Sequence, residues 1–325
     1  MTRSSPPRVS VVIATHNRAD LLPACVESIR QQTLQDLEIV VVDDASSDRT
    51  PEVLEELRAA DPRVRPVRAA RNLGPGGARN LGAREARAPL IAVLDDDDRS
   101  LPTRLEKQAG YLDQRPEVDG LFTAIRWHDA AGVTLRHVTG PILADSLPRD
   151  PGELFELLYL DSNRLTSTTL MIRRDALLEE PYAEDVRVGE DWSMFLRLSA
   201  RGRLLRSIPE SLVDMQRDAG HASLMSDKAR AFADQRRVLR QIRAWLRQCG
   251  IRDFDSLHRR AWARQLVREA RFWYGARALA LIGRALLSAP RDREPWRAVA
   301  WLGGVARAKA ARRLVGPPGG AEGQP

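Results

Sequence analysis

Cysteine is scarce in this chain of 325 residues, which holds only Cys25 and Cys249. The two thiols stand far apart and outside any metal-type spacing, so we interpret them as free thiols rather than as a disulfide framework or a zinc site. Long apolar runs are missing as well. No window approaches the roughly 18 residues of a spanning helix, and the first residues lack the layout of a signal peptide. We therefore expect a cytoplasmic protein, kept reduced, that does not cross a membrane.

Two familiar phosphate-binding patterns are also absent. The glycines of residues 72–77 match neither the P-loop nor the dinucleotide-binding fingerprint, which argues against a nucleotide triphosphatase and against an NAD enzyme. Two interpretations of this glycine-rich segment stay open. It can bring the backbone close to a phosphate or sugar, or it can be only a turn.

The composition, 43% apolar and 29% charged, is that of a folded soluble protein, but the charge is unevenly spread. Residues 226–325 carry 22 Lys and Arg against 8 Asp and Glu, whereas residues 1–225 are acidic. This asymmetry predicts two regions with different partners. We expect one folded domain over residues 1–225, a basic helical region over residues 226–315, and a disordered tail rich in Gly and Pro over residues 316–325.

Strand and helix patterns alternate in the first third of the chain. Strands are predicted over residues 9–14, 37–42, 63–67 and 90–94, with helices over residues 20–31, from Thr50 onward and over 78–86. This order is typical of an α/β fold with a Rossmann-like, mostly parallel sheet flanked by helices. Farther along, we expect strands over residues 121–127 and 166–172, helices over 152–160 and 191–200, and then a C-terminal helical region.

Three polar clusters follow the predicted strands at their carboxyl ends, where ligands bind in open parallel sheets. They are Thr15-His16-Asn17, Asp43-Asp44 and Asp95-Asp96-Asp97-Asp98. Four adjacent carboxylates repel one another, so a fold tolerates them chiefly beside something positive. Hard cations such as Mg²⁺ or Mn²⁺ take carboxylate oxygens and are shared with substrate phosphates. The alternative interpretation of the acidic run is a solvated loop.

Candidate roles follow from this chemistry. Asp44 can accept hydrogen bonds from a nucleotide base or ribose, or it can be only an N-cap or turn residue. Asp97 can hold a cation that neutralises a diphosphate leaving group. Asp191 follows Glu190 at the start of a helix, where it can serve as a cap or as a general base for an acceptor hydroxyl. His221 is either a loop histidine or a late metal ligand.

Taken together, these motifs resemble those of the family 2 glycosyltransferases, which have the GT-A fold. The similarity runs from Val9 to about residue 226, through VSVVIATHNR (9–18), EIVVVDDASSD (38–48), RNLG (71–74), ARNLG (78–82), LDDDD (94–98) and GEDW (189–192). The resemblance implies that residues 1–225 are a GT-A catalytic domain. It implies that Asp191 is the general base and that Asp97 and His221 hold the metal. The donor nucleotide is then expected to be bound by Ala14, His16, Asn17, Asp44, Arg71, Arg79, Asp95 and Asp96.

The activity that the resemblance implies is that of an inverting glycosyltransferase (EC 2.4) dependent on Mn²⁺ or Mg²⁺. It would move a sugar from a nucleotide-sugar, with UDP expected, to an acceptor hydroxyl in cell-envelope polysaccharide or glycolipid synthesis. The alternatives are a catalytically inactive nucleotide-sugar-binding or scaffold protein and a metal-dependent nucleotidyltransferase. Two segments depart from the family pattern. His16 stands where an aromatic residue is common, and Tyr182-Ala183-Glu184-Asp185 replaces an aromatic-acid-acid stretch, so the acceptor side is expected to differ.

Five of the seven tryptophans lie within residues 226–315, interleaved with arginine. This pattern suits peripheral contact with an anionic membrane, at the inner face of the plasma membrane and near a saccharide or lipid-linked acceptor. The alternative is a helical cap that buries its aromatic rings against the catalytic domain. Nucleic acid is not an expected partner, because the domain over residues 1–225 already has an expected ligand that contains phosphate.

Overall fold

A computed structural model describes residues 6–128, 134–138 (backbone only), 147–161, 163, 165–216, 227–251, 254–273 and 276–300. The chain divides into two compact units, residues 1–245 and residues 246–325. Each unit is described by itself. The boundary that the sequence predicts at residues 225/226 rests on composition, and it stays a prediction.

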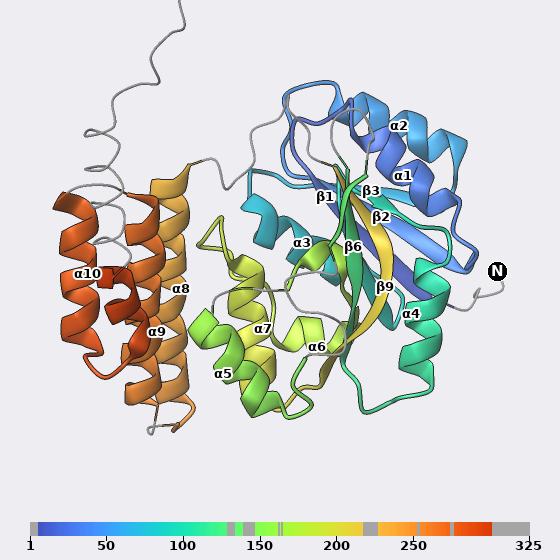
Figure 1. Cartoon of the computed structure of the whole chain (residues 1–325). Helices are drawn as coiled ribbons and strands as arrows, with labels where there is room; N and C mark the ends of the chain where they lie inside the picture. Colours follow the sequence, from blue (N-terminus) through green and yellow to red (C-terminus); the bar gives the residue numbers. More distant parts are fainter. Residues whose placement is uncertain are drawn as a thin grey trace, which may run out of the picture. The chain divides into compact units, whose positions relative to one another are not determined.

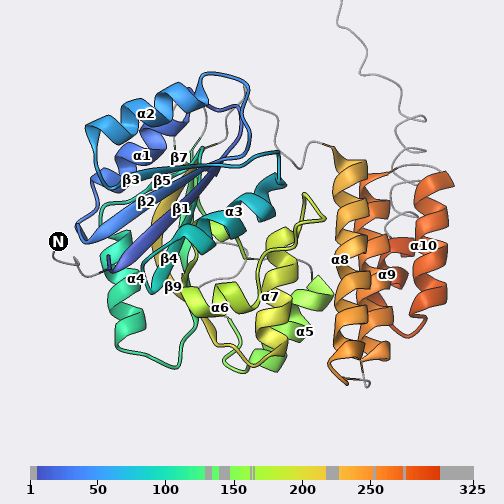
Figure 2. The same cartoon turned by 180° about the vertical axis from the view of Figure 1, so that it is seen from behind.

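The first unit is built on one twisted sheet (Figures 1 and 2). Four parallel strands stand in the order β3 (Val64–Arg68), β2 (Leu37–Asp43), β1 (Val9–Thr15) and β4 (Leu90–Asp95). Beyond β4 the sheet continues with β8 (Met171–Arg173), β6 (Gly120–His128), β9 (Leu205–Gln216) and β5 (Arg99–Ser100), while β7 (Thr134–Val138) pairs with β6. Strand β8 is antiparallel to both β4 and β6, so the sheet is mixed beyond the parallel half.

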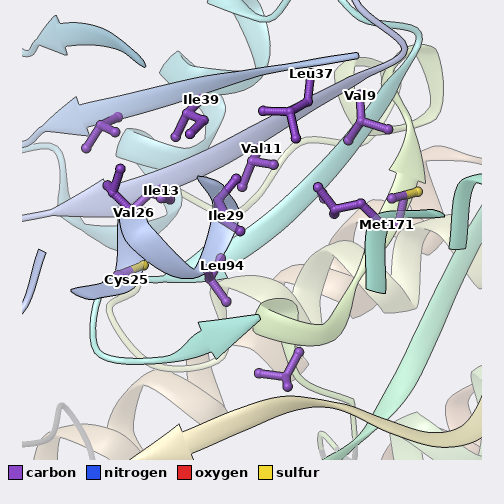
Figure 3. Close-up of a cluster of buried hydrophobic side chains, with 14 of the residues drawn as sticks. Val9, Val11, Ile13, Cys25, Val26, Ile29, Leu37, Ile39, Leu94 and Met171 are labelled. Carbon is purple, nitrogen blue, oxygen red and sulfur yellow. The ribbon is translucent and has the colours of Figure 1, made fainter. Parts of the chain in front are cut away.

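The parallel half is covered on both faces, which explains why its strands are continuously apolar. Val9, Val11 and Ile13 of β1 point to the face packed by α1 (Leu22–Arg30), α2 (Thr50–Ala60) and α4 (Arg104–Asp113) (Figure 3). Helix α3 (Gly74–Glu85) lies on the opposite face. A Cβ added at Gly82 would lie 2.5 Å from a methyl group of Val12, so glycine permits this close approach.

The strand register aligns the carboxyl ends of β1, β2 and β4. Thr15 is opposite Asp43 of β2, and Ala14 is opposite Asp95 of β4. The three polar clusters of the sequence therefore lie at one edge of the sheet. The predicted fold class, a mostly parallel α/β sheet with flanking helices and a C-terminal helical region, is confirmed.

The second half of this unit also contains helices. They are α5 (Pro151–Asp161), α6 (Arg174–Glu179), α7 (Glu190–Ala200) and α8 (Lys228–Gln248), with a 3₁₀ turn at Ser167–Thr169. Trp192 is fully buried and donates from its indole nitrogen to the carbonyl of Leu158 at 2.9 Å, which joins α7 to α5. The Tyr159 hydroxyl donates to the carbonyl of Leu239 in α8 at 3.3 Å. This hydrogen bond joins α8 to α5.

The second unit contains α9 (Asp255–Phe272), α10 (Ala276–Ser288) and a further helix that begins at residue 293. Its core consists mainly of alanine and aliphatic side chains: Ala263, Leu266, Val267, Ala270, Ala278, Leu281, Ile282, Ala285, Ala289 and Ala298. Within the residues described, no helix combines the length and the apolar character that crossing a bilayer requires. The predicted disordered tail, residues 316–325, lies outside the described residues.

Two local predictions are wrong. The helix predicted over residues 78–86 begins earlier than expected, because α3 already starts at Gly74 within the glycine-rich segment. Residues 166–172 do not form one strand. They form the 3₁₀ turn and then the start of the short strand β8.

Candidate active site

The turn after β1 is fastened to the turn after β2. Asn17 adopts a left-handed backbone conformation with φ of 55°. Its side-chain oxygen accepts the backbone N–H of Ser47 at 2.8 Å, and its own N–H donates to the Ser46 hydroxyl at 2.9 Å. His16 Nδ1 lies 2.8 Å from the carbonyl oxygen of Asp44, so Nδ1 carries the proton in this contact. His16 and Asn17 are therefore held beside Asp44.

Asp44 fastens this edge of the sheet to the glycine-rich segment. Its two carboxylate oxygens accept the backbone N–H groups of Leu73 at 2.6 Å and Gly74 at 2.9 Å. Gly74 has φ of +77°, which a residue with a Cβ adopts only with strain. A Cβ at Gly76 would stand 2.5 Å from the carbonyl oxygen of Ala183, so the start of α3 lies directly against the segment that precedes α7.

Arg79 joins the end of β4 to the start of α7. Its guanidinium donates to Asp95 at 2.6 Å and to Glu190 at 2.7 Å, and it lies over the Tyr182 ring at 5.5 Å. Burial alone would lower the pKa of Arg79, but the two carboxylates outweigh it and raise the pKa well above its usual value. The guanidinium thus stays charged inside the protein and couples two distant acidic motifs.

Each of the remaining acidic side chains of the run has its own surroundings. Arg18 donates to Asp96 at 3.0 Å and to Asp97 at 2.7 Å. Burial raises the pKa of Asp96 to about 6 despite Arg18. The Thr168 hydroxyl donates to Asp98 at 2.7 Å. Because Asp96 and Asp98 are buried, the run is not a solvated acidic loop.

Asp191 lies at the N-terminus of α7, next to Glu190. Its Oδ1 accepts from the Asn163 amide at 2.8 Å and from the N–H of Trp192 at 2.7 Å. Burial and the neighbouring Glu190 carboxylate raise the pKa of Asp191 to about 7. A carboxylate with a pKa near neutrality binds and releases a proton readily at working pH, which is the property a general base needs.

The other predicted site residues have simpler surroundings. Ala14 lies in β1 beside Asp95, and Arg71 is exposed on the segment leading to α3. His221 lies outside the described residues. Asn163, Arg18 and Thr168 contact the predicted site residues or their neighbours, although none of the three is among the predicted site residues. Arg18 directly follows His16-Asn17 in the same motif, and this position could have indicated that it lies at the site. No feature of the sequence indicates that Thr168 lies there.

The carboxylates at this edge suit a hard cation by chemistry but do not form a complete cage. Among the described residues, no group of three or more His, Cys, Asp or Glu side chains is arranged to hold a metal ion. Asp97 and Asp95 are the more accessible carboxylates of the run, with 31% and 30% of their side chains exposed. Ions such as Mg²⁺ and Mn²⁺ need few protein carboxylates, because they usually keep several waters and bind substrate phosphates. The residues present therefore fit a cation shared with a substrate.

The sheet, with its acidic edge and a carboxylate of raised pKa nearby, is that of a GT-A glycosyltransferase. The family model "Glycosyl transferase family 2" matches residues 10–179, so the chain belongs to this family. It is accordingly a glycosyltransferase of the EC 2.4 class. The predicted family is confirmed.

Curated relatives agree with this assignment. An uncharacterized glycosyltransferase of Methanocaldococcus jannaschii is 31% identical over 210 residues, which are 64% of this chain and 70% of that protein. The succinoglycan biosynthesis protein ExoO of Rhizobium meliloti is 46% identical over 101 residues, 31% of this chain and 28% of ExoO. The UDP-Glc:alpha-D-GlcNAc-diphosphoundecaprenol beta-1,3-glucosyltransferase WfaP of Escherichia coli is 25% identical over 72% of this chain and 86% of WfaP.

Solved structures share the fold at low sequence identity. A TarS structure from S. aureus has a TM-score of 0.62 at 16% identity and covers 87% of this chain and 81% of its own. The mannosyltransferase PcManGT from Pyrobaculum calidifontis, in complex with GDP-Man and Mn²⁺, has a TM-score of 0.58 at 19% identity and covers 96% of this chain and 82% of its own. At these identities the likeness establishes the GT-A fold alone.

Proposed function

We propose that this glycosyltransferase transfers a sugar, with inversion, from a UDP-sugar to an acceptor hydroxyl in cell-envelope polysaccharide or glycolipid synthesis. The observation that carries the proposal is the position of Asp191. This carboxylate has a pKa of about 7 and adjoins Glu190, which Arg79 links to the acidic end of β4. One connected set of side chains thus links the residues proposed to bind the donor with the residue proposed to accept the proton in a single-displacement reaction.

In the proposed mechanism, Asp191 takes the proton of the acceptor hydroxyl as that oxygen attacks the anomeric carbon. Asn163 and the Trp192 N–H hold the carboxylate in place while it accepts the proton. Asp44, His16 and Asn17 provide polar groups for the base and ribose of the donor. Asp97, and by expectation His221, would hold a Mn²⁺ or Mg²⁺ ion. This ion would supply positive charge to the departing diphosphate.

Relatives support the donor and acceptor classes. WfaP uses a UDP-sugar and a diphosphoundecaprenol-linked acceptor by its name, and a TarS structure in complex with UDP-GlcNAc has a TM-score of 0.58. PcManGT is seen with Mn²⁺. A lipid-linked acceptor in turn favours a cytoplasmic protein in peripheral contact with the membrane. The alternative donor is GDP-mannose, because PcManGT, which shares the fold, is seen in complex with GDP-Man.

We expect UDP and Mn²⁺ together to raise the melting temperature of the protein more than either alone. At a ligand concentration of about 100 times the dissociation constant, the free energy of unfolding rises by about 2.7 kcal/mol. UDP, GDP, dTDP and CMP should be compared with and without Mn²⁺ in a thermal-shift assay. Stabilisation by none of them would support the inactive scaffold alternative. Release of pyrophosphate from a nucleoside triphosphate would instead identify a nucleotidyltransferase.

We expect Asp97→Asn to lose most of the Mn²⁺-dependent part of this stabilisation while keeping the fold. The amide oxygen can still accept from Arg18, but it carries no charge for a cation. Asp36→Asn is a matched control, because Asp36 is an exposed aspartate away from the acidic edge. Equal metal dependence in the two variants would contradict the role of Asp97.

A further inference from the structure

The unit formed by residues 246–325 contains a strongly basic cavity. Its volume is about 390 Å³, and it is lined by Arg260, Arg264, Arg291, Asp292, Arg293, Glu294 and Arg297. Five guanidinium groups thus face two carboxylates. Like charges gathered in this way repel one another, and the repulsion is relieved when an anion binds among them.

Asp292 organises the inner wall of this cavity. It is buried, and its oxygens accept from Arg264 Nε at 3.2 Å, from Arg260 Nε at 3.4 Å and from the backbone N–H of Glu294 at 2.9 Å. Glu294 in turn accepts from Arg297 at 2.8 Å. The acids therefore hold the inner arginines and the first turn of the helix that begins at residue 293 in place.

Arg291 and Arg293 also line the cavity. Both are exposed, and neither has an ion-pair partner among the residues that the structure describes. Guanidinium groups bind both carboxylate and phosphate through paired N–H donors. A phosphate group offers more acceptor oxygens than a carboxylate, so it suits a cavity lined by several arginines.

Exposed apolar side chains lie close in sequence to the lining residues of the cavity. The indole nitrogen of Trp296 donates to the carbonyl of Pro290 at 2.8 Å, next to Arg291, while 55% of Trp296 is exposed. Leu287 is 86% exposed and lies three residues before Pro290. Indole rings favour the headgroup level of a bilayer, where an apolar ring meets polar groups. A soluble phosphate would make no use of these apolar side chains.

We infer that this cavity binds the phosphate group of an anionic lipid headgroup, with Trp296 and Leu287 inserted at the membrane surface. The inference rests on the proposed function for its biological purpose, which is to keep the enzyme near a lipid-linked acceptor. It adds a particular site to the general expectation of membrane contact. Its test uses lipid binding alone, so its failure would leave the transfer reaction untouched.

The test is sedimentation of the full-length protein with phosphatidylcholine vesicles, with and without phosphatidylglycerol. We expect binding only to the anionic vesicles. Arg291→Gln/Arg293→Gln should weaken it by roughly 30-fold, since each basic side chain near an anionic membrane contributes about five- to sixfold. Arg259→Gln/Arg284→Gln removes the same charge from exposed positions outside the cavity, and it should weaken binding far less. Equal losses in the two double variants would overturn the site in favour of diffuse electrostatic attraction.

Two further variants separate the remaining outcomes. Arg291→Lys/Arg293→Lys keeps the charge but loses the paired donors, so intermediate binding with an unchanged melting temperature supports the site even if the Gln variant unfolds. Trp296→Ala should weaken binding to anionic vesicles and leave stabilisation by inorganic phosphate unchanged. If inorganic phosphate competes fully with vesicles and Trp296→Ala has no effect, the ligand is a free phosphate and the lipid assignment is wrong. Absence of binding to any anionic vesicle likewise refutes it.

Discussion

Asp191→Asn is expected to lower the rate of sugar transfer by about 10²- to 10⁴-fold, the usual contribution of a positioned general base. Asparagine has nearly the same shape and keeps an oxygen for the Asn163 amide and the Trp192 N–H. It cannot accept the proton of an acceptor hydroxyl. The dissociation constant of the nucleoside diphosphate should therefore stay within a few-fold of the wild-type value, and steady-state kinetics together with calorimetry separate the two effects.

The same substitution should raise the free energy of unfolding. The pKa of Asp191 is about 7 in the folded protein against an ordinary value of 3.8, so the folded state holds this proton more tightly than the unfolded chain. The stability that the protonated group contributes is complete below pH of about 4 and is lost as pH rises through about 7. The asparagine side chain would carry no charge at any pH in this range. We expect the variant to be more stable than the wild type by at least about 1 kcal/mol at pH 8, and by less at pH 5.

Asp175→Asn is the control for this experiment. Asp175 is an exposed aspartate in the first turn of α6. Removing its charge should change neither the transfer rate nor the pH dependence of stability by much, because exposed charges contribute little. If Asp191→Asn retained turnover at the level of Asp175→Asn, another group would have to be the base.

The pH dependence of the wild-type rate gives a separate prediction. The base must be ionised to accept a proton, so kcat/KM should rise with pH and level off above about 7. An aspartate with its ordinary pKa would give a rate that is flat down to about pH 5. A profile without an acid limb near neutrality would therefore contradict the assignment of Asp191, whatever the result of mutagenesis.

The parallel half of the sheet was predictable because its strands are buried on both faces and so consist of β-branched runs, as in Val9–Thr15 and Leu37–Asp43. The strand ends were predictable for the same reason, since a polar cluster interrupts each run. The start of α3 was not. Glycine disfavours a helix, but Asp44, thirty residues away, accepts the N–H groups of Leu73 and Gly74 and fixes the first turn. Such a tertiary hydrogen bond leaves no trace in a local pattern.

The connections within the site were hidden for a similar reason. Arg79 and Glu190 are 111 residues apart in sequence, and each taken alone has the ordinary pattern of a helical surface residue. The short strand Arg99–Ser100 pairs with Asp214 and Val213 of β9, although two residues are too few for any strand pattern. The sequence identifies the two acidic motifs, whereas only the folded chain shows that Arg79 joins them.

Arg79→Met is expected to destabilise the protein by about 3–5 kcal/mol, because it leaves the carboxylates of Asp95 and Glu190 without their shared cation in a largely buried place. Methionine fills similar space, so lost packing contributes little. Arg79→Lys should recover only part of this loss, since a single ammonium lacks the planar fork that serves both carboxylates. Denaturant unfolding at pH 7 measures the difference. Arg84→Met, an exposed position in the last turn of α3, is the control for removing an arginine from this helix.

Kinetic measurements can show whether the Arg79–Glu190 ion pair changes the pKa of Asp191 or only stabilises the fold. Arg79 lowers the pKa of Asp191 and the Glu190 carboxylate raises it. Arg79→Met, assayed at a temperature where it is folded, should therefore move the acid limb of the kcat/KM profile to higher pH. Glu190→Gln removes the like charge but keeps an acceptor for Arg79, so it should move the same limb to lower pH. Shifts of opposite sign would show that Arg79 and Glu190 act on Asp191 electrostatically. If the acid limb of the kcat/KM profile were unchanged in both variants, the Arg79–Glu190 ion pair would have only a structural role. Loss of packing alone would not shift the two profiles in opposite directions.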